Sequence, residues 1–214
     1  MPVVTIRGQL GSGAPEIGKV IADKLHTDYV DREIIAEVAE FLNRREKDIT
    51  EKEMPPGSLL GRVAMALGHM PPAIVGPSGE YTGVYLPTWE IPLEDTRYLE
   101  GLKSIIRELA MSESVVIRGR GSQFILKHYP GALHVLVVSP LKLRVRRVME
   151  DMKIDEESAK KEIERFDGSR RQFIKKYFEA ELEDPVHYDL VINTEHLNFE
   201  ATASIVVNAL PLKS

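Results

Sequence analysis

Two hydrophobic patterns alternate along the chain. Short runs of apolar, mostly β-branched residues are typical of buried strands, and apolar residues at every third or fourth position are typical of amphipathic helices. The first pattern predicts strands at residues 3–6, 114–117, 133–138 and 190–192, and residues 28–31 are expected to form a further short strand. The second predicts helices at residues 15–25, 32–42, 96–111, 122–128, 141–152, 156–178 and 199–210. Strands that alternate with helices favour an α/β fold with a mostly parallel sheet and helices on both faces.

The middle of the chain departs from this rhythm. Residues 54–92 contain repeated proline and glycine pairs, which break regular structure, and one short helix is expected at 59–67. The segment is also rich in methionine, tyrosine and leucine and contains the single tryptophan. It fits either an irregular packed loop or subunit contact, as in a homo-oligomer, or an acceptor lobe over about 50–95 that closes over a second substrate. We expect one domain, 1–214, that includes this insertion.

Composition narrows the possible classes of function. The chain of 214 residues is 43% hydrophobic, has a net charge of −5 and lacks cysteine. An acidic balance argues against a nucleic-acid-binding module, and the absence of cysteine excludes a disulfide framework or thiolate site. No stretch is long and apolar enough to span a membrane, and residues 1–7 lead directly into a strand. We therefore expect a soluble, cytoplasmic protein.

The charge is unevenly distributed. Between Lys142 and Lys176 there are twelve lysines and arginines against eight acidic residues. This segment fits a solvated helical face with ion pairs one turn apart, or a set of arginines that converge on phosphate.

A glycine-rich turn between the first strand and helix suggests phosphate binding. Gly8, Gly11 and Gly13 surround Ser12, and exposed backbone N–H groups with a helix dipole attract phosphate at such a turn. The spacing between Gly8 and Gly13 matches the first half of the P-loop pattern.

The second half of that pattern is missing. Ala14 replaces the lysine, Pro15 replaces the serine or threonine, and Glu16 follows. The change removes a cation for the transferring phosphate and a hydroxyl ligand for Mg²⁺. The nearby residues that could replace them in part are Arg7, Ser12 and Lys19.

Other charged residues follow the strands at the carboxyl edge of the predicted sheet, where ligands bind in open α/β folds. Arg120 lies between two glycines after the third strand, and Asp31 ends the second. Further cations are predicted on two helices: Arg144, Arg146, Arg147, Arg170, Arg171, Lys175 and Lys176. Several cations at one edge are what a phosphoryl-transfer site requires.

Four blocks together resemble the bacterial cytidylate kinase-like family, a group of P-loop nucleoside monophosphate kinases. The blocks are VVTIRGQLGSGAPEIGKVIADKL with YVDREII, VVIRGRGSQFIL, GALHVLVVSPLKLRVRRVMED, and DPVHYDLVINTEHLNFEATASIV. The resemblance implies a three-layer P-loop NTPase fold with a five-stranded parallel sheet of order 2-3-1-4-5. It also implies an arginine-bearing lid at about 142–178 and use of ATP with Mg²⁺.

The resemblance implies roles for individual residues. Those expected at the ATP phosphates are Gly8, Gly11, Ser12 and Gly13, with Arg7 beside them. Those expected near the rest of the nucleotide are Arg144, Asn193 and Thr194. The residues expected to take part in catalysis are Arg147, Arg170, Arg171 and Asp31, and those expected at the acceptor are Arg120 and Asp167. No metal ligand is assigned, and Gly121 stands where cytidylate kinases typically have an aspartate that reads the base.

Two functions follow as hypotheses. The first is Mg²⁺-dependent transfer of the ATP γ-phosphoryl group to a small phosphorylated acceptor such as a nucleoside monophosphate. The second is a non-catalytic nucleotide-binding or regulatory protein that kept the kinase fold and lost the loop lysine and hydroxyl. An interaction module that uses the insertion remains a third possibility.

Overall fold

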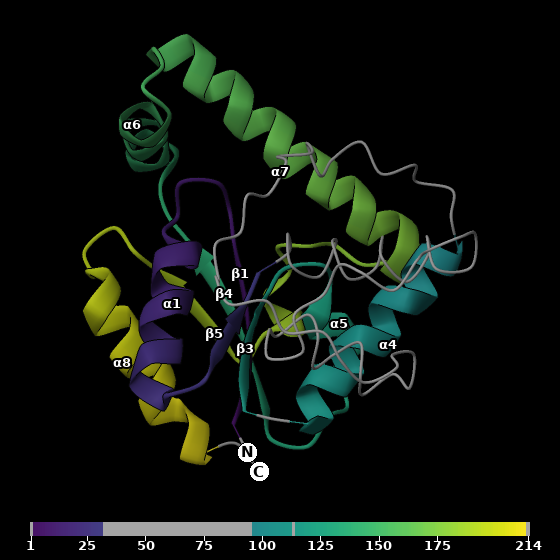
Figure 1. Ribbon diagram of the computed structural model, residues 1–214. Helices are drawn as coiled ribbons and strands as arrows, with labels where there is room; N and C mark the ends of the chain where they lie inside the picture. The colour runs from purple at the N-terminus through teal and green to yellow at the C-terminus, as the bar shows by residue number, and fades with distance from the viewer. Residues whose placement is uncertain (1, 32–95, 113, 213–214) are drawn as a thin grey trace, which may run out of the picture. The chain divides into compact units, whose positions relative to one another are not determined.

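The sheet has five parallel strands. The computed structural model describes residues 2–31, 96–112 and 114–212. The strands are β1 (Val3–Gly8), β2 (Asp28–Val30), β3 (Val115–Arg118), β4 (Ala132–Val138) and β5 (Leu190–Asn193). Their order, β2-β3-β1-β4-β5, confirms the predicted 2-3-1-4-5 arrangement (Figure 1). In the parallel register Ile6 lies opposite Arg118 on β3 and Val135 on β4.

The described helices lie close to their predicted positions, with one exception. They are α1 (Ala14–Leu25), α4 (Thr96–Ser112), α5 (Ser122–Ile125), α6 (Leu141–Met152), α7 (Glu156–Phe178) and α8 (Phe199–Ala209). The prediction of a helix over 122–128 is wrong beyond Ile125. There the Tyr129 N–H bonds the Leu126 carbonyl in a turn, and Pro130 disfavours a helical conformation for the residue before it. The predicted helices at 32–42 and 59–67 lie outside the described residues.

The main core joins the sheet to two helices. Apolar side chains on one face of β1, such as Ile6, pack with Ile17 of α1 and Val206 of α8. The two helices lie side by side over this face (Figure 1), and the Lys24 ammonium bonds the Glu200 carboxylate at 2.5 Å between them. Each buried side chain of this size stabilises the fold by about 1.5–3 kcal/mol. The start of α1 is thereby fixed at the end of β1.

A second, smaller core lies between α6 and α7. Val145 and Val148 of α6 pack with Ala159 and Ile163 of α7, and Leu10 of the glycine-rich turn packs against them. Asp155 caps α7 by accepting a hydrogen bond from the Ser158 N–H at 2.8 Å. This core holds the turn against α6.

The chain divides into two compact units, residues 1–31 with 113–214, and residues 32–112. The sheet and the glycine-rich turn belong to the first unit. The second unit contains α4, whose buried residues, such as Leu102 and Ile106, share one helical face. The predicted insertion over 50–95 also falls in this unit and lies outside the described residues. No helix in the described part of the chain is long and apolar enough to cross a membrane.

Candidate functional site: a glycine-rich turn anchored by arginines

The turn between β1 and α1 requires glycine at two positions. Gly11 and Gly13 have φ angles of 78° and 90°, a region that favours glycine. A Cβ on Gly13 would lie 2.2 Å from the Phe199 ring, and one on Gly11 would lie 2.6 Å from the Arg144 carbonyl oxygen. Gly13 also caps α1, whose first N–H groups have no partner within the helix. The turn therefore has the backbone geometry of an anion cradle at a helix start.

Two arginines of α6 bind the carbonyl oxygens of this turn. Arg144 Nη1 donates to the Leu10 carbonyl at 3.2 Å. Arg147 Nη1 lies 3.2 Å from the Gly11 carbonyl oxygen and 3.3 Å from that of Ser12. The guanidinium groups therefore place two positive charges against the negative ends of three successive peptide dipoles. This contact was not predicted, because both arginines were expected at the nucleotide itself.

Arg144 is held by a buried carboxylate. Its Nη1 lies 2.7 Å from Asp167 Oδ2 on α7, and Asp167 Oδ1 accepts the Leu10 N–H at 3.0 Å. The Arg144 and Asp167 residues are 7% and 3% exposed. Asp167, expected at the acceptor, is thus engaged by α6 and the turn.

Thr194 closes the network after β5. Its hydroxyl donates to the Ser12 carbonyl at 2.8 Å and accepts from Arg147 Nη1 at 3.1 Å. Arg147 Nη2 also donates to the Thr194 carbonyl at 3.2 Å, and its guanidinium lies 5.1 Å from the Phe199 ring centroid. Burial lowers the pKa of Arg147, with its neighbour Arg146 adding to the effect, but the group stays charged at neutral pH. Asn193, the other residue predicted here, is exposed and accepts the Glu195 N–H at 3.0 Å.

Two buried polar atoms beside the turn have no hydrogen-bond partner among the described residues. Ser12 is fully buried, and its hydroxyl is unpaired. Arg7 is 6% exposed, its Nη1 donates to the Gly8 carbonyl, and its Nη2 is unpaired. Burial lowers the pKa of Arg7, because the charged form loses its hydration. Unpaired buried donors are costly, so their position beside an anion cradle indicates a ligand.

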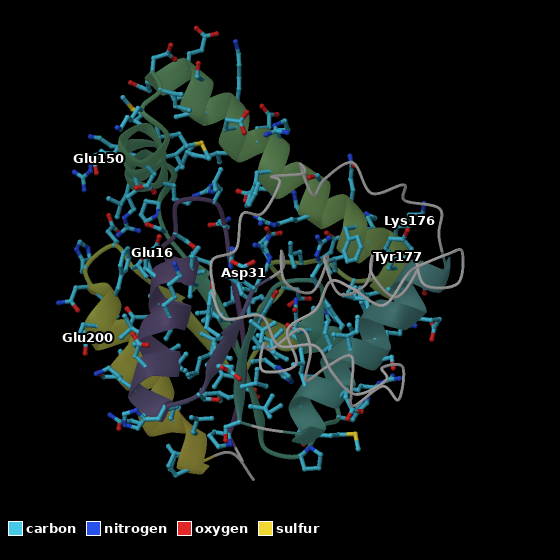
Figure 2. All side chains as sticks on the ribbon, viewed as in Figure 1. Glu16, Asp31, Glu150, Lys176, Tyr177 and Glu200 are labelled. Atoms are coloured by element: carbon cyan, nitrogen blue, oxygen red, sulfur yellow. The ribbon has the colours of Figure 1, made fainter. Side chains whose placement is uncertain are left out.

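A second group of charges lies at the ends of β2 and β3. Arg118 Nη2 bonds Asp31 Oδ2 at 2.7 Å. Arg120, in the turn after β3, has a φ of 55° between two glycines that also have positive φ. Asp31 and Arg120 were predicted, whereas Arg118 was missed, although a charged residue ending an apolar strand is a recognisable signal. Figure 2 shows Asp31 and, on the first turn of α1, Glu16.

The two predicted catalytic arginines of α7 have other contacts. The Arg170 guanidinium lies 3.1 Å from the Phe166 ring centroid, and Arg171 Nη1 lies 3.8 Å from Glu183 Oε1. Their role in catalysis stays a prediction.

The N–H and hydroxyl donors of the glycine-rich turn suit the phosphates of a nucleotide, and they do not suit a metal ion held by protein ligands alone. No group of three or more His, Cys, Asp or Glu residues that could hold a metal is found in the described part of the chain. Mg²⁺ commonly binds substrate phosphates and waters with only one or two carboxylates. The exposed Glu16, at the start of α1, is the carboxylate nearest in sequence to the turn. The residues present therefore fit Mg²⁺ that arrives with a triphosphate.

Comparison with known sequences gives a family and two partial relatives. The model of the cytidylate kinase-like family matches residues 3–196. Cytidylate kinase of Staphylothermus marinus is 28% identical over 120 residues, which are 56% of this chain and 62% of that protein. Uronate isomerase of Corynebacterium glutamicum is 30% identical over 104 residues, which are 49% of this chain and 20% of that protein. The chain thus matches less than two thirds of the length of either curated relative.

One solved structure shares the architecture over the whole chain. An uncharacterized protein from Eubacterium ventriosum superposes with a TM-score of 0.69 at 17% identity, and the match covers 99% of each chain. At this identity the likeness shows the fold alone.

Proposed function

Because the chain belongs to the cytidylate kinase-like family, we propose that it transfers the γ-phosphoryl group of a nucleoside triphosphate to a small phosphorylated acceptor. A nucleoside monophosphate is the acceptor to test first. The observation that carries this proposal is the glycine-rich turn, whose carbonyl oxygens are bound by Arg144 and Arg147 and whose Ser12 hydroxyl is buried without a partner. A turn arranged in this way offers N–H donors and positive charge to phosphate although the loop lysine is absent.

In this mechanism the turn holds the triphosphate through backbone N–H groups and Ser12. Arg144, Arg147 and Asp167 are positioning residues, because all three contact the turn; Arg144 and Asp167 also pair with each other, and Arg147 also bonds Thr194. Fixed dipoles and charges accelerate the reaction since they need no reorganisation as charge moves to the leaving oxygen. Mg²⁺ bound with the triphosphate would neutralise part of its charge.

The reaction itself needs little from side chains. An ionised phosphate oxygen of the acceptor attacks the γ-phosphorus, the bond from the γ-phosphorus to the β–γ bridging oxygen breaks, and a nucleoside diphosphate leaves. Since the attacking oxygen already carries negative charge, no general base has to remove a proton. Alignment of the two substrates is then the main requirement.

The test is a coupled assay of nucleoside diphosphate release from ATP with each nucleoside monophosphate in turn. Arg147→Ala removes the guanidinium contacts to Gly11, Ser12 and Thr194 and should lower kcat/KM about 10- to 100-fold, as expected when charge-assisted hydrogen bonds are lost. Arg146→Ala removes an exposed neighbouring charge and is the matched control. Equal activity in the two variants would refute the role of the arginine-bound turn.

A second function is favoured by the residues at the start of α1. Ala14 is 2% exposed and stands at the lysine position, and Pro15 supplies neither a hydroxyl nor an N–H. These features suit a regulatory protein that binds a nucleotide without turning it over. Triphosphate binding with no transfer to any monophosphate would support this function in place of catalysis.

A further inference from the structure

Arg7 occupies a different position from the residues that hold the turn. Ile6, which precedes it on β1, packs in the core with α1, and successive side chains of a strand point to opposite faces. The Arg7 side chain therefore lies on the face of the sheet away from α1. Tyr188 is close enough to act on its charge, and the Tyr188 hydroxyl accepts a hydrogen bond from Gln123 of α5 at 3.1 Å.

The Arg7 guanidinium is buried, and among the described residues it forms no ion pair. Asp167 and Glu183 attract its charge from beyond ion-pair distance, and their own ion pairs are with Arg144 and Arg171. Its Nη1 uses a backbone carbonyl, which leaves Nη2 as an open donor. Attraction from carboxylates beyond ion-pair distance compensates this buried charge only in part, so an anion bound at Nη2 would stabilise it.

The turn after β3 brings more donors to the same place. The Gly119 N–H bonds the carbonyl of Ile6 at 3.2 Å, so this turn lies directly beside the end of β1. Ser122, which follows it at the start of α5, is 1% exposed and its hydroxyl has no partner. Arg7 and Ser122 are thus two buried, unpaired donors on neighbouring segments.

Building on the phosphotransfer proposed above, we propose that Arg7 binds the phosphate monoester of the acceptor, on the face of the sheet away from α1. In phosphoryl transfer the attacking and leaving oxygens lie roughly in line on opposite sides of the phosphorus. The turn at the start of α1 binds the triphosphate, which carries the leaving oxygen. A cation on the other face of the sheet is therefore placed to bind the acceptor, which carries the attacking oxygen. The sequence predicts Arg7 beside the ATP phosphates, whereas this proposal assigns it to the phosphate of the acceptor.

The test follows the guanidinium of Arg7 directly. Its ¹⁵N resonances, assigned by comparison with Arg7→Lys, are recorded while inorganic phosphate is added, with and without a saturating non-hydrolysable ATP analogue. We expect phosphate to shift them in both cases. If the analogue alone shifts them and phosphate then has no effect, Arg7 serves the donor and the proposal is wrong. If the analogue does not bind but phosphate still shifts them, the proposed function fails while the anion site at Arg7 stands.

Substitution provides the second arm. Arg7→Met keeps an unbranched apolar stem and removes the guanidinium and its charge, and Arg165→Met removes an exposed charge of α7 as the matched control. We expect Arg7→Met to weaken phosphate binding roughly 10- to 100-fold and to leave the melting temperature of the ligand-free protein unchanged or raised. Unchanged phosphate affinity in Arg7→Met would overturn the proposal. If Arg7→Met fails to fold, the resonance titration of the unmodified protein decides.

Discussion

The buried ion pair between Arg144 and Asp167 offers the sharpest test of how the turn is held. Asp167→Asn keeps an oxygen for the Leu10 N–H but leaves the Arg144 charge without its partner at a site where both residues are almost fully buried. Removal of one member of a buried pair typically costs about 3–5 kcal/mol. The lower value corresponds to a fall in Tm of about 6–12 °C for a chain of this size.

The assay is urea unfolding of Asp167→Asn beside Glu162→Gln. Glu162 lies on the same helix and pairs with Arg165 at 2.6 Å, but on the surface, where such a pair contributes less than about 1 kcal/mol. The two variants make the same change of charge, so their difference isolates burial. A loss below about 1 kcal/mol in Asp167→Asn would refute the reasoning, because buried pairs are expected to cost more.

A double variant separates stability from positioning. Arg144→Met with Asp167→Leu removes both charges and should be more stable than Asp167→Asn alone, since no buried charge is left unpaired. Leu10 loses both of its side-chain partners in this variant, so triphosphate affinity should remain low.

Two further predictions concern the turn and the tyrosines. Gly13→Ala should destabilise the protein by about 1–3 kcal/mol and abolish triphosphate binding, because its Cβ would clash with Phe199. The Cβ of Gly168→Ala in α7 meets nothing within 4 Å, so this control should stabilise the protein by up to about 1 kcal/mol. Urea unfolding measures the stability of both variants, and a binding titration measures their triphosphate affinity. Burial raises the pKa of Tyr29 and Tyr188 to about 12, above the usual value of 10.0. The folded state therefore holds these protons more tightly, so this stabilisation is complete below pH 10 and is lost as the pH rises from 10 to 12. The urea midpoint should fall less between pH 8 and 11 in Tyr188→Phe than in the unmodified protein, and an equal fall would contradict this.

The sheet could be predicted from the chain because most of its strands are short apolar runs; β2, with the sequence DYV, is the exception. The run at 133–138, for example, became the interior strand β4, which pairs with both β1 and β5. The helix predicted to end at 128 was wrong because an apolar pattern does not reveal a turn stabilised by the Leu126 carbonyl.

The site was predictable only in part. The glycines were found because a strand, a glycine-rich turn and a helix follow one another directly. Arg144 and Arg147 are three residues apart, which places them on one helical face, yet their contact with carbonyl oxygens of the turn depends on how α6 packs. The pairing of Arg144 with Asp167 depends on how α6 and α7 pack against each other, and a periodic pattern within one helix contains no information about a partner on another.

The most direct test of the central claim is calorimetric titration of the unmodified protein with ATP and with its non-hydrolysable analogue, each with and without Mg²⁺. The claim is that the turn between β1 and α1 holds the phosphates of a nucleoside triphosphate without the loop lysine. It predicts micromolar binding that is strengthened by Mg²⁺. No binding at millimolar nucleotide would contradict it.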